Sequence, residues 1–260
     1  WQLGLTNSVA RNSWSQVTNS NIVKSADSEV VSIAAGWTTS YAVKSDGKLF
    51  VIGSRVLGAT GDGTTANVLY TTWTQAAALS GVNIVKVAAC FQGFTPLALA
   101  SDGTVWGAGQ NATGQLGLDS AASTPTWTQN NMTNVVDISI GLNQSVILKN
   151  DNTIWIAGAM SGVSHYTFTQ IGSNDYTGVA AGTSHFMARK KDGTVVATGQ
   201  NYYGQLGNSN DLIYTGDWQN INPTNVSMVA SGYMHQFALK SDGTLWGTGY
   251  NSSNGELGLV

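Results

Sequence analysis

The chain has 260 residues, of which 42% are hydrophobic and 10% charged, and its formal net charge is -3. This length and composition predict one large domain over residues 1–260 with a sizeable buried core. Eleven Lys and Arg residues form no basic stripe, which argues against a nucleic-acid partner. No apolar run approaches the roughly 20 residues that a membrane-spanning helix needs, so we expect no membrane insertion.

Glycine and proline usage indicates the fold class. The chain contains 31 Gly and only three Pro, and Ser, Thr and Asn fill many of the polar positions. No window places apolar residues at helical spacing over three turns. Many short strands joined by tight turns fit this composition better than long helices do. The sequence therefore predicts an all-β protein.

The first recurring element is a strand that ends in small residues. In four copies its last glycine lies ten residues before a recurring Asp, whereas the second copy has Cys90 twelve residues before Asp102 and hence a longer loop. Small side chains are expected where neighbouring sheets crowd together. The copies are IAAG (33–36), VAAC (87–90), ISIG (138–141), VAAG (179–182) and VASG (229–232).

The second element is a hairpin. Asp-Gly between two apolar runs is a strong hairpin signal, and we expect both central residues to have positive φ. Asn152 replaces the glycine in the third copy and tolerates that conformation. The spacing of 41 to 56 residues between copies is typical of repeat arrays and propellers. The hairpins are centred on Asp46, Asp102, Asp151, Asp192 and Asp242.

The third element is a glycine turn. It reads GQNATGQLGL at 109–118, GQNYYGQLGN at 199–208 and GYNSSNGELGL at 249–259, with WQLGL at 1–5. We expect Gly114 and Gly117 to allow a tight path and Leu116 to insert between sheets. The Gln115 amide is expected to satisfy backbone groups of the loop, as are the equivalent Gln2, Gln205 and Glu256. The third unit has lost this turn.

The fourth element is a strand that opens on an aromatic residue, which makes four strands per unit. Because hairpin strands such as KLFVIG and TIWIAG are apolar on both faces, each four-stranded sheet needs a covering sheet on either side. Stacked copies of the same sheet form a β-propeller. The aromatic-led strands are WSQV (14–17), WTQA (73–76), WTQN (127–130), FTQI (168–171) and WQNI (218–221).

Together these elements resemble the regulator of chromosome condensation (RCC-type) repeat family. The shared pattern is small-small-Gly, a hydrophobic pair, Asp-Gly, an aromatic strand, Gly-x-Asn and Gly-Gln-Leu-Gly, as in 179–207 and 229–259. The resemblance implies a propeller of four-stranded antiparallel blades. It also implies seven blades, whereas this chain holds five hairpins. Five blades that close on themselves, or part of a larger ring, both fit the sequence, and we favour five.

No catalytic, metal or cofactor site is predicted. His185 and His235 both lie three residues after the repeat glycine, where the family pattern places a structural residue, and with His165 and Cys90 they offer too few ligands for a metal. The chain has no Gly-x-Ser-x-Gly motif and no paired carboxylates. We therefore expect a protein that is not an enzyme. Cys90 is the single cysteine, so an internal disulfide is impossible.

The remaining candidate site is a surface made by the segments that follow the repeat glycine. Their residues differ from unit to unit, and variable loops on a fixed scaffold are how rigid folds host binding. Ordinary loop packing is the alternative. Tyr202 and Tyr203 on a glycine turn offer a separate patch. The predicted partner-binding residues are Trp37, Phe91, Phe94, Leu142, Asn143, His185, Tyr233 and Met234.

The function hypothesis is a binding or structural module on a phage virion, as a tail or fibre appendage, or on a bacterial surface. It rests on low charge, abundant Ser, Thr, Asn and Gly, one cysteine, and a chain that begins at Trp1 as if processed or cut from a larger assembly. Its partner would be a protein or glycan. The alternative is a cytoplasmic protein-interaction propeller, because the resemblance includes exchange factors for small GTPases and enzyme inhibitors.

Overall fold

The computed structural model describes residues 13, 15–26, 28–66, 68–91, 93–160, 162–209, 214–252 and 255–258. These residues form β-strands and two three-residue 3₁₀ helices, so the all-β prediction is confirmed. The chain divides into two compact units, Trp1–Ala112 with Ala121–Asn134, and Thr113–Ser120 with Val135–Val260. The expectation of a single domain over residues 1–260 stays a prediction.

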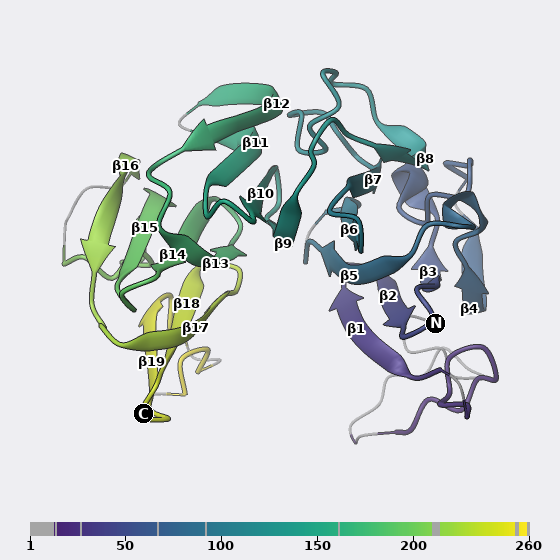
Figure 1. The fold of residues 1–260 in the computed structure, drawn as a ribbon, viewed down its shortest axis with the longest axis horizontal. Helices are drawn as coiled ribbons and strands as arrows, with labels where there is room; N and C mark the ends of the chain where they lie inside the picture. Colours follow the sequence, from purple (N-terminus) through teal and green to yellow (C-terminus); the bar gives the residue numbers. More distant parts are fainter. Residues whose placement is uncertain are drawn as a thin grey trace. The chain divides into compact units, whose positions relative to one another are not determined.

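The first unit contains two four-stranded antiparallel sheets, each in simple chain order (Figure 1). The 3₁₀ helices η1 (Val56–Gly58) and η2 (Ala77–Leu79) flank the fourth strand of the first sheet. The strands of the first sheet are β1 (Val30–Ala35), β2 (Thr39–Lys44), β3 (Leu49–Ser54) and β4 (Leu69–Gln75). Those of the second are β5 (Ile84–Ala89), β6 (Pro96–Ala100), β7 (Val105–Gly109) and β8 (Thr124–Gln129).

The second unit contains three antiparallel sheets in the same chain order. Its first sheet is β9 (Val135–Ile140), β10 (Gln144–Lys149), β11 (Ile154–Met160) and β12 (Val163–Ile171). Its second is β13 (Tyr176–Ala181), β14 (His185–Lys190), β15 (Val195–Gln200) and β16 (Tyr214–Ile221). Its third has three strands among the described residues, β17 (Val226–Ser231), β18 (His235–Lys240) and β19 (Leu245–Gly249).

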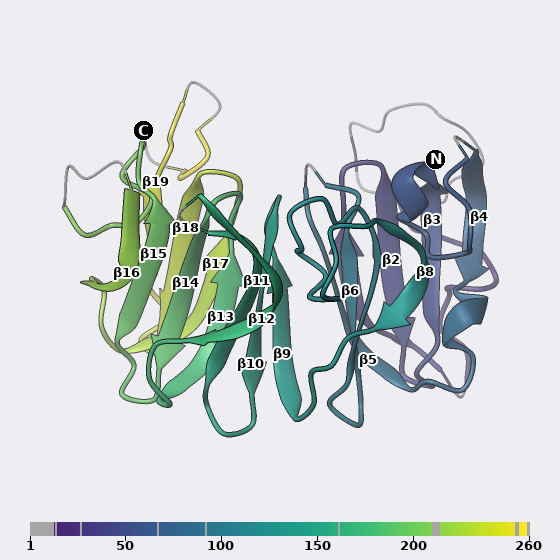
Figure 2. The same cartoon turned by 90° about the horizontal axis from the view of Figure 1, so that it is seen from above.

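The strands of each unit stand side by side, so their connections gather at two ends (Figure 2). At one end lie the Asp-Gly turns between the second and third strands of each sheet. At the other lie the connections from first to second strand and from third to fourth strand. We call this second end the loop end of the unit.

The Asp-Gly hairpins are present in all five sheets, but their turn type differs from the one expected. Only the residue after each Asp has positive φ, namely Gly47, Gly103, Asn152, Gly193 and Gly243. Gly47 donates its N–H to the Lys44 carbonyl, and Lys44 donates to the Lys48 carbonyl. This is a turn closed by a left-handed residue and a bulge, which needs one positive φ instead of two. The prediction of two was wrong because Asp occupies the position before the left-handed one.

The Asp side chain explains why the turn uses this residue. Asp102 Oδ1 accepts from the N–H of Thr104 at 3.0 Å and from its hydroxyl at 2.7 Å. The Trp106 indole then donates to that Thr104 hydroxyl at 3.3 Å. The same Asp-Thr-Trp relay recurs at Asp151 and Asp242. A short polar side chain that bonds the backbone two residues on is a local stabiliser of turns.

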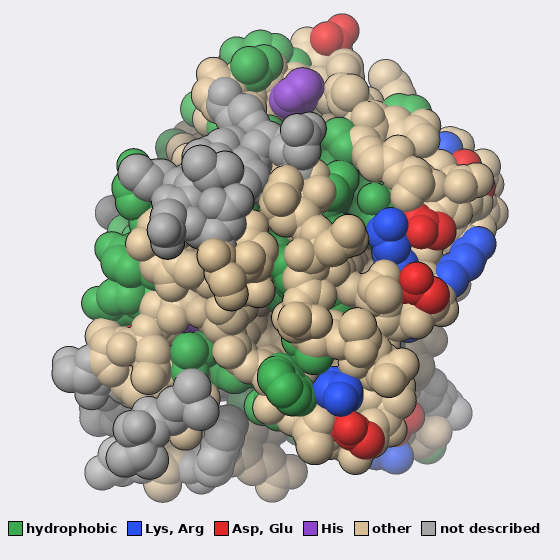
Figure 3. Space-filling view, turned by 90° about the vertical axis from the view of Figure 1, so that its left-hand side faces the viewer, with side chains coloured by type: hydrophobic (Ala, Val, Ile, Leu, Met, Phe, Trp, Pro, Cys, Tyr) green, Lys and Arg blue, Asp and Glu red, His purple; other side chains and the backbone are tan. Residues whose placement is uncertain are grey.

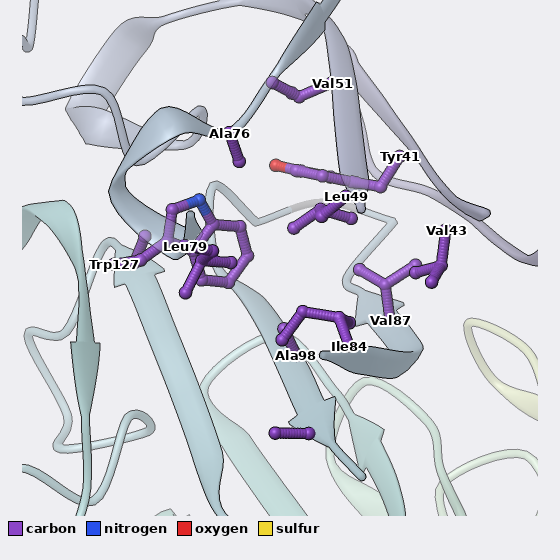
Figure 4. Close-up of a cluster of buried hydrophobic side chains, with 12 residues drawn as sticks. Tyr41, Val43, Leu49, Val51, Ala76, Leu79, Ile84, Val87, Ala98 and Trp127 are labelled. Atoms are coloured by element: carbon purple, nitrogen blue, oxygen red, sulfur yellow. The ribbon is translucent and has the colours of Figure 1, made fainter. Parts of the chain in front are cut away.

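Successive sheets within a unit bury apolar residues between them. In the first unit, Tyr41 and Val51 of the first sheet share one cluster with Ile84, Val87 and Ala98 of the second (Figure 4). Every residue of β3 is buried, which shows that this hairpin strand is covered on both faces. The Tyr41 hydroxyl donates to the Ala59 carbonyl at 2.6 Å, so the buried ring keeps a hydrogen bond.

The second unit repeats this packing at equivalent positions. Ile154 and Ile156 of β11 cluster with Val179 and Phe186 of the next sheet. Leu206, from a Gly-Gln-Leu-Gly turn, is buried in the cluster between β13–β16 and β17–β19. This agrees with the prediction that the leucine of a glycine turn inserts between sheets. Burial of such side chains stabilises by about 1.5–3 kcal/mol each, so repetition of the pattern holds the sheets together.

Two strand predictions need correction. Residues 15–17 of WSQV lie outside any strand, and Trp14 falls outside the described residues; Val17 instead packs with Trp73 against the first sheet. The predicted four strands per repeat are present in four of the sheets. The sheet of β17–β19 has three strands among the described residues. The other four aromatic segments lie in β4, β8, β12 and β16, but each of these strands begins three to five residues before its aromatic residue, so the aromatic does not open the strand.

The contact between Gly117 and Phe168 gives a test of the glycine turn. Gly117 has φ +65°, and a Cβ there would overlap the Phe168 ring, whereas Gly162 has φ +77° with nothing within 4 Å. Alanine at either position meets the left-handed strain of about 1–2 kcal/mol. We expect Gly117→Ala to lower the free energy of unfolding in urea by a further ~1–3 kcal/mol through overpacking. Equal losses for Gly117→Ala and Gly162→Ala would contradict this packing role.

Candidate binding surface at the loop ends

One backbone hydrogen bond recurs at the loop end of every sheet. The residue after the recurring positive-φ glycine near the end of the third strand donates its N–H to a carbonyl in the loop between the first and second strands. This bond ties the two loops of each sheet together and fixes their register. The pairs are Ser54 to Thr38, Gln110 to Phe94, Ala159 to Asn143, Gln200 to Ser184 and Tyr250 to Met234.

In the first three sheets, a side chain at or directly before the start of the second strand adds a cap to this end. Thr39 donates to the Ser54 carbonyl at 2.9 Å, and Thr95 donates to the Gln110 carbonyl at 2.8 Å. Gln144, with its amide oriented to suit both neighbours, donates to the Ala159 carbonyl at 2.7 Å and accepts from the His185 N–H at 3.1 Å. In these three sheets the side chain therefore donates a hydrogen bond to a carbonyl that would otherwise have no partner at the end of the sheet.

His185 and His235 occupy the equivalent position at the start of the second strand in the fourth and fifth sheets. His185 is 1% exposed, and neither ring nitrogen has a hydrogen-bond partner among the described residues. Its ring lies against Gly182, where no Cβ would fit. Burial, with a smaller contribution from nearby His235, lowers the pKa of His185 to about 4. His185 thus lies beneath the loop end and does not belong to its surface, in contrast to its assignment from sequence.

The glycine turns are held from within by their glutamine. Gln115 is buried, and its Oε1 accepts from the Thr113 N–H at 3.1 Å and from the Thr113 hydroxyl at 2.7 Å. Gln205 accepts from the Tyr203 N–H at 2.8 Å, and Glu256 accepts from the Ser252 N–H at 2.7 Å. These bonds confirm that the side chain satisfies loop backbone. Gln2 lies outside the described residues.

In the first unit, three of the predicted aromatic residues gather at the loop end. Trp37 follows β1, and Phe91 and Phe94 follow β5. The rings of Trp37 and Phe94 stack with centroids 5.9 Å apart, although Trp37 is 56% exposed. Phe91 is also exposed. The exposed Trp37 ring, held by the half-buried Phe94 beneath it, presents a rigid apolar surface at low entropic cost.

In the second unit, tyrosines form the equivalent surface. Tyr203 is 47% exposed and meets Tyr250 edge to face, with ring centroids 4.7 Å apart. Tyr202 and Tyr233 are exposed at the same end. Tyr250 escaped the sequence prediction, although its place after Gly249 in GYN matches the Gln of the other GQN turns. Aligning the glycine turns of the three repeats would have identified Tyr250.

Leu142, Asn143 and Met234 are half-buried, and the backbone carbonyls of Asn143 and Met234 serve the recurring loop bonds. These three residues therefore expose less side-chain area at the loop end than the aromatic residues do.

Uncharged side chains and backbone dominate the face drawn in Figure 3, where Lys and Arg lie beside Asp and Glu. Among the described residues no group of three or more His, Cys, Asp or Glu is placed to hold a metal ion. Nor does that part of the chain contain a helix long and apolar enough to cross a membrane.

The buried histidine predicts a pH dependence of stability. The unfolded state binds a proton near pH 6.5 and the folded state only near pH 4, so the free energy of unfolding rises between these values and is level above them. The rise due to His185 is about 3 kcal/mol. We expect His185→Gln, which copies Gln144, to flatten this slope in urea titrations from pH 4 to 7. A slope unchanged in His185→Gln, or one abolished equally by His165→Gln, would contradict the assignment.

The comparisons with known proteins agree with this architecture. Residues 102–148 and 176–205 each match a family model described as the regulator of chromosome condensation (RCC1) repeat. The structure of yeast RCC1 (Prp20) bound to Kap60 is 21% identical, with a TM-score of 0.73 over 86% of this chain and 57% of that one. Human WBSCR16 is 17% identical, with a TM-score of 0.74 over 87% and 63% of the two chains.

A second structure of Prp20p from Saccharomyces cerevisiae, studied with its binding to Gsp1p and histones, is 19% identical with a TM-score of 0.73. It is covered over 59% of its length, and this chain over 86%. The chain therefore spans less than two thirds of these proteins, and their likeness concerns the fold. With matched repeats at 102–148 and 176–205 and five antiparallel sheets in chain order, the chain carries RCC1-type repeats and has a β-propeller fold like that of these structures.

Proposed function

We propose that this protein is a non-enzymatic binding module that engages its partner through the aromatic residues of its loop ends. The observation that carries the proposal is the exposure of aromatic side chains that pack on one another at that end in both units, as a stacked pair in the first unit and an edge-to-face pair in the second. Large aromatics on a rigid frame are the residues that dominate binding energy at interfaces. The recurring backbone bonds supply the frame.

The chemistry of these surfaces suits a protein or a glycan. Trp and Tyr rings bury apolar area and keep one polar group for hydrogen bonds. A protein partner has support from relatives, since yeast RCC1 (Prp20) binds Kap60 and was studied for binding to Gsp1p and histones. Tyr203 and Tyr250 would contribute as one packed unit, as would Trp37 and Phe94.

We place the module on a phage virion, as a tail or fibre appendage, or on a bacterial surface, as part of a larger assembly. The support is compositional: 10% charged residues, one cysteine and abundant small polar residues. A cytoplasmic protein-interaction propeller, such as an exchange factor for a small GTPase or an enzyme inhibitor, is the second candidate. The observation that favours it is the likeness in fold to Prp20, whose partners include Gsp1p.

The aromatic surface is tested by titrating fluorescently labelled protein onto intact bacterial cells and, in parallel, onto an immobilised small GTPase. Tyr203→Ala combined with Tyr250→Ala, and separately Trp37→Ala, are expected to weaken binding at least tenfold, because exposed aromatic anchors cost about 2 kcal/mol or more on truncation. Trp155→Ala, in a strand that starts from the Asp151-Asn152 turn at the opposite end, is the control and should bind normally.

Binding to cells but not to the GTPase supports the exterior module, and the reverse supports the second candidate. Binding that survives all the loop-end substitutions while Trp155→Ala abolishes it would show that the loop end is not the binding surface. Circular dichroism spectra of each variant establish that it is folded.

A further inference from the structure

One position beneath the loop ends can titrate in the second unit but not in the first. This position, at or directly before the start of the second strand, holds an uncharged side chain in three sheets and an imidazole in two. Thr and Gln do not gain a proton, whereas His does so in mildly acidic solution. The five residues in chain order are Thr39, Thr95, Gln144, His185 and His235.

The surroundings of His185 give an added proton no compensation. The side chain is 1% exposed, and within the part of the chain that the structure describes neither ring nitrogen has a hydrogen-bond partner. Gly182, Gly199 and Gln144 pack against this residue and are uncharged. His235 on β18 is the titratable group whose charge acts on the ring, and that charge is of like sign. A buried cation without a partner is costly, so the protonated ring has to reach water.

Backbone bonds beside this buried histidine hold segments that carry tyrosines. Gln200 donates its N–H to the Ser184 carbonyl at 2.9 Å, and the glycine turn with Tyr203 begins directly after it. Thr183 donates its N–H to the Tyr233 carbonyl at 3.2 Å and so joins the loop of the fourth sheet to that of the fifth. The acceptor and the donor are the two residues that precede the histidine in the chain. Movement of its ring out to water therefore displaces both bonds.

We propose that the loop end of the fourth and fifth sheets is an acid-sensitive switch, in which protonation of His185 opens the loop at 182–185. Opening releases Tyr233 and the glycine turn at 199–208 from their backbone bonds. The switch rests on the proposed function, because these tyrosines belong to the binding surface proposed above. Acid weakens binding by this surface, whereas the surface at Trp37 lies over sheets with threonine at the equivalent position and does not respond.

Hydrogen exchange of the full chain, followed amide by amide at pH 7 and pH 5, tests the switch without any partner. The imidazole pKa is about 6.5 in the open loop and about 4 in the closed one, so the opening constant rises up to about tenfold for each pH unit between these values. We expect the protection factors of the Thr183 and Gln200 amides to fall at least tenfold. The Ser54 and Gln110 amides, which donate the equivalent bonds in the first unit, should keep theirs.

The variant His185→Gln, which copies the residue of the third sheet, should abolish this fall. His165→Gln, on β12, is the matched control and should behave as the parent does. An equal fall at the Ser54 amide, no fall at the Gln200 amide, or a fall that persists in His185→Gln would each overturn the proposal. The comparison of the two units within the parent chain decides the matter even if His185→Gln does not fold.

Binding is measured in the same pH range on intact bacterial cells and on the immobilised small GTPase. Parent protein bound at pH 7 should dissociate at least tenfold faster after a shift to pH 5, and His185→Gln should dissociate at an unchanged rate. Equally fast release of His185→Gln would overturn the switch. A chain that binds neither target contradicts the proposed function, whereas hydrogen exchange of the unbound chain still decides the switch.

Discussion

The structure depends on one constraint, the need to cover both faces of the hairpin strands in every repeat. A sheet whose second and third strands are apolar on both sides cannot expose either face without losing about 25 cal/mol for each Å² of apolar surface. Neighbouring repeats cover these faces. In the first unit Tyr41 and Val51 pack in one cluster with Ile84 and Val87. In the second unit Ile154 and Ile156 pack in one cluster with Val179. A single repeat has no such partner, so a sheet is stable only when it packs against its neighbours.

The same constraint explains the placement of glycine and of small residues. Gly141 lies so close to the Gly182 backbone that a side chain would not fit between these two first strands. At the outer side of the sheets, Gly61 receives the Trp127 ring and Gly117 receives the Phe168 ring. Trp127 also donates its indole N–H to the Thr60 carbonyl at 3.2 Å. A turn of one repeat is thus locked onto the outer strand of the next, which extends the contact beyond the apolar core.

Much of this was predictable from sequence because the signals recur. Asp-Gly between apolar runs located all five hairpins, and the aromatic-led segments located β4, β8, β12 and β16. Residues 15–17 resemble those segments in sequence but lie outside any strand, because a short segment forms a strand only where it pairs with a sheet edge. The turn type was missed because Asp-Gly alone does not reveal which of its two residues is left-handed. Burial of His185 depends on the neighbouring sheet and on Gly182, which no local pattern reports.

The loop ends can vary because the backbone bonds beneath them recur in every sheet. The residue after the recurring glycine donates to a loop carbonyl, so the main chain at this end is fixed in the same way in all five sheets. Side chains such as Trp37 and Tyr203 can therefore differ between sheets without cost to the strands below them. Recognition by these ends rests on those side chains, held on a backbone that the repeat keeps constant.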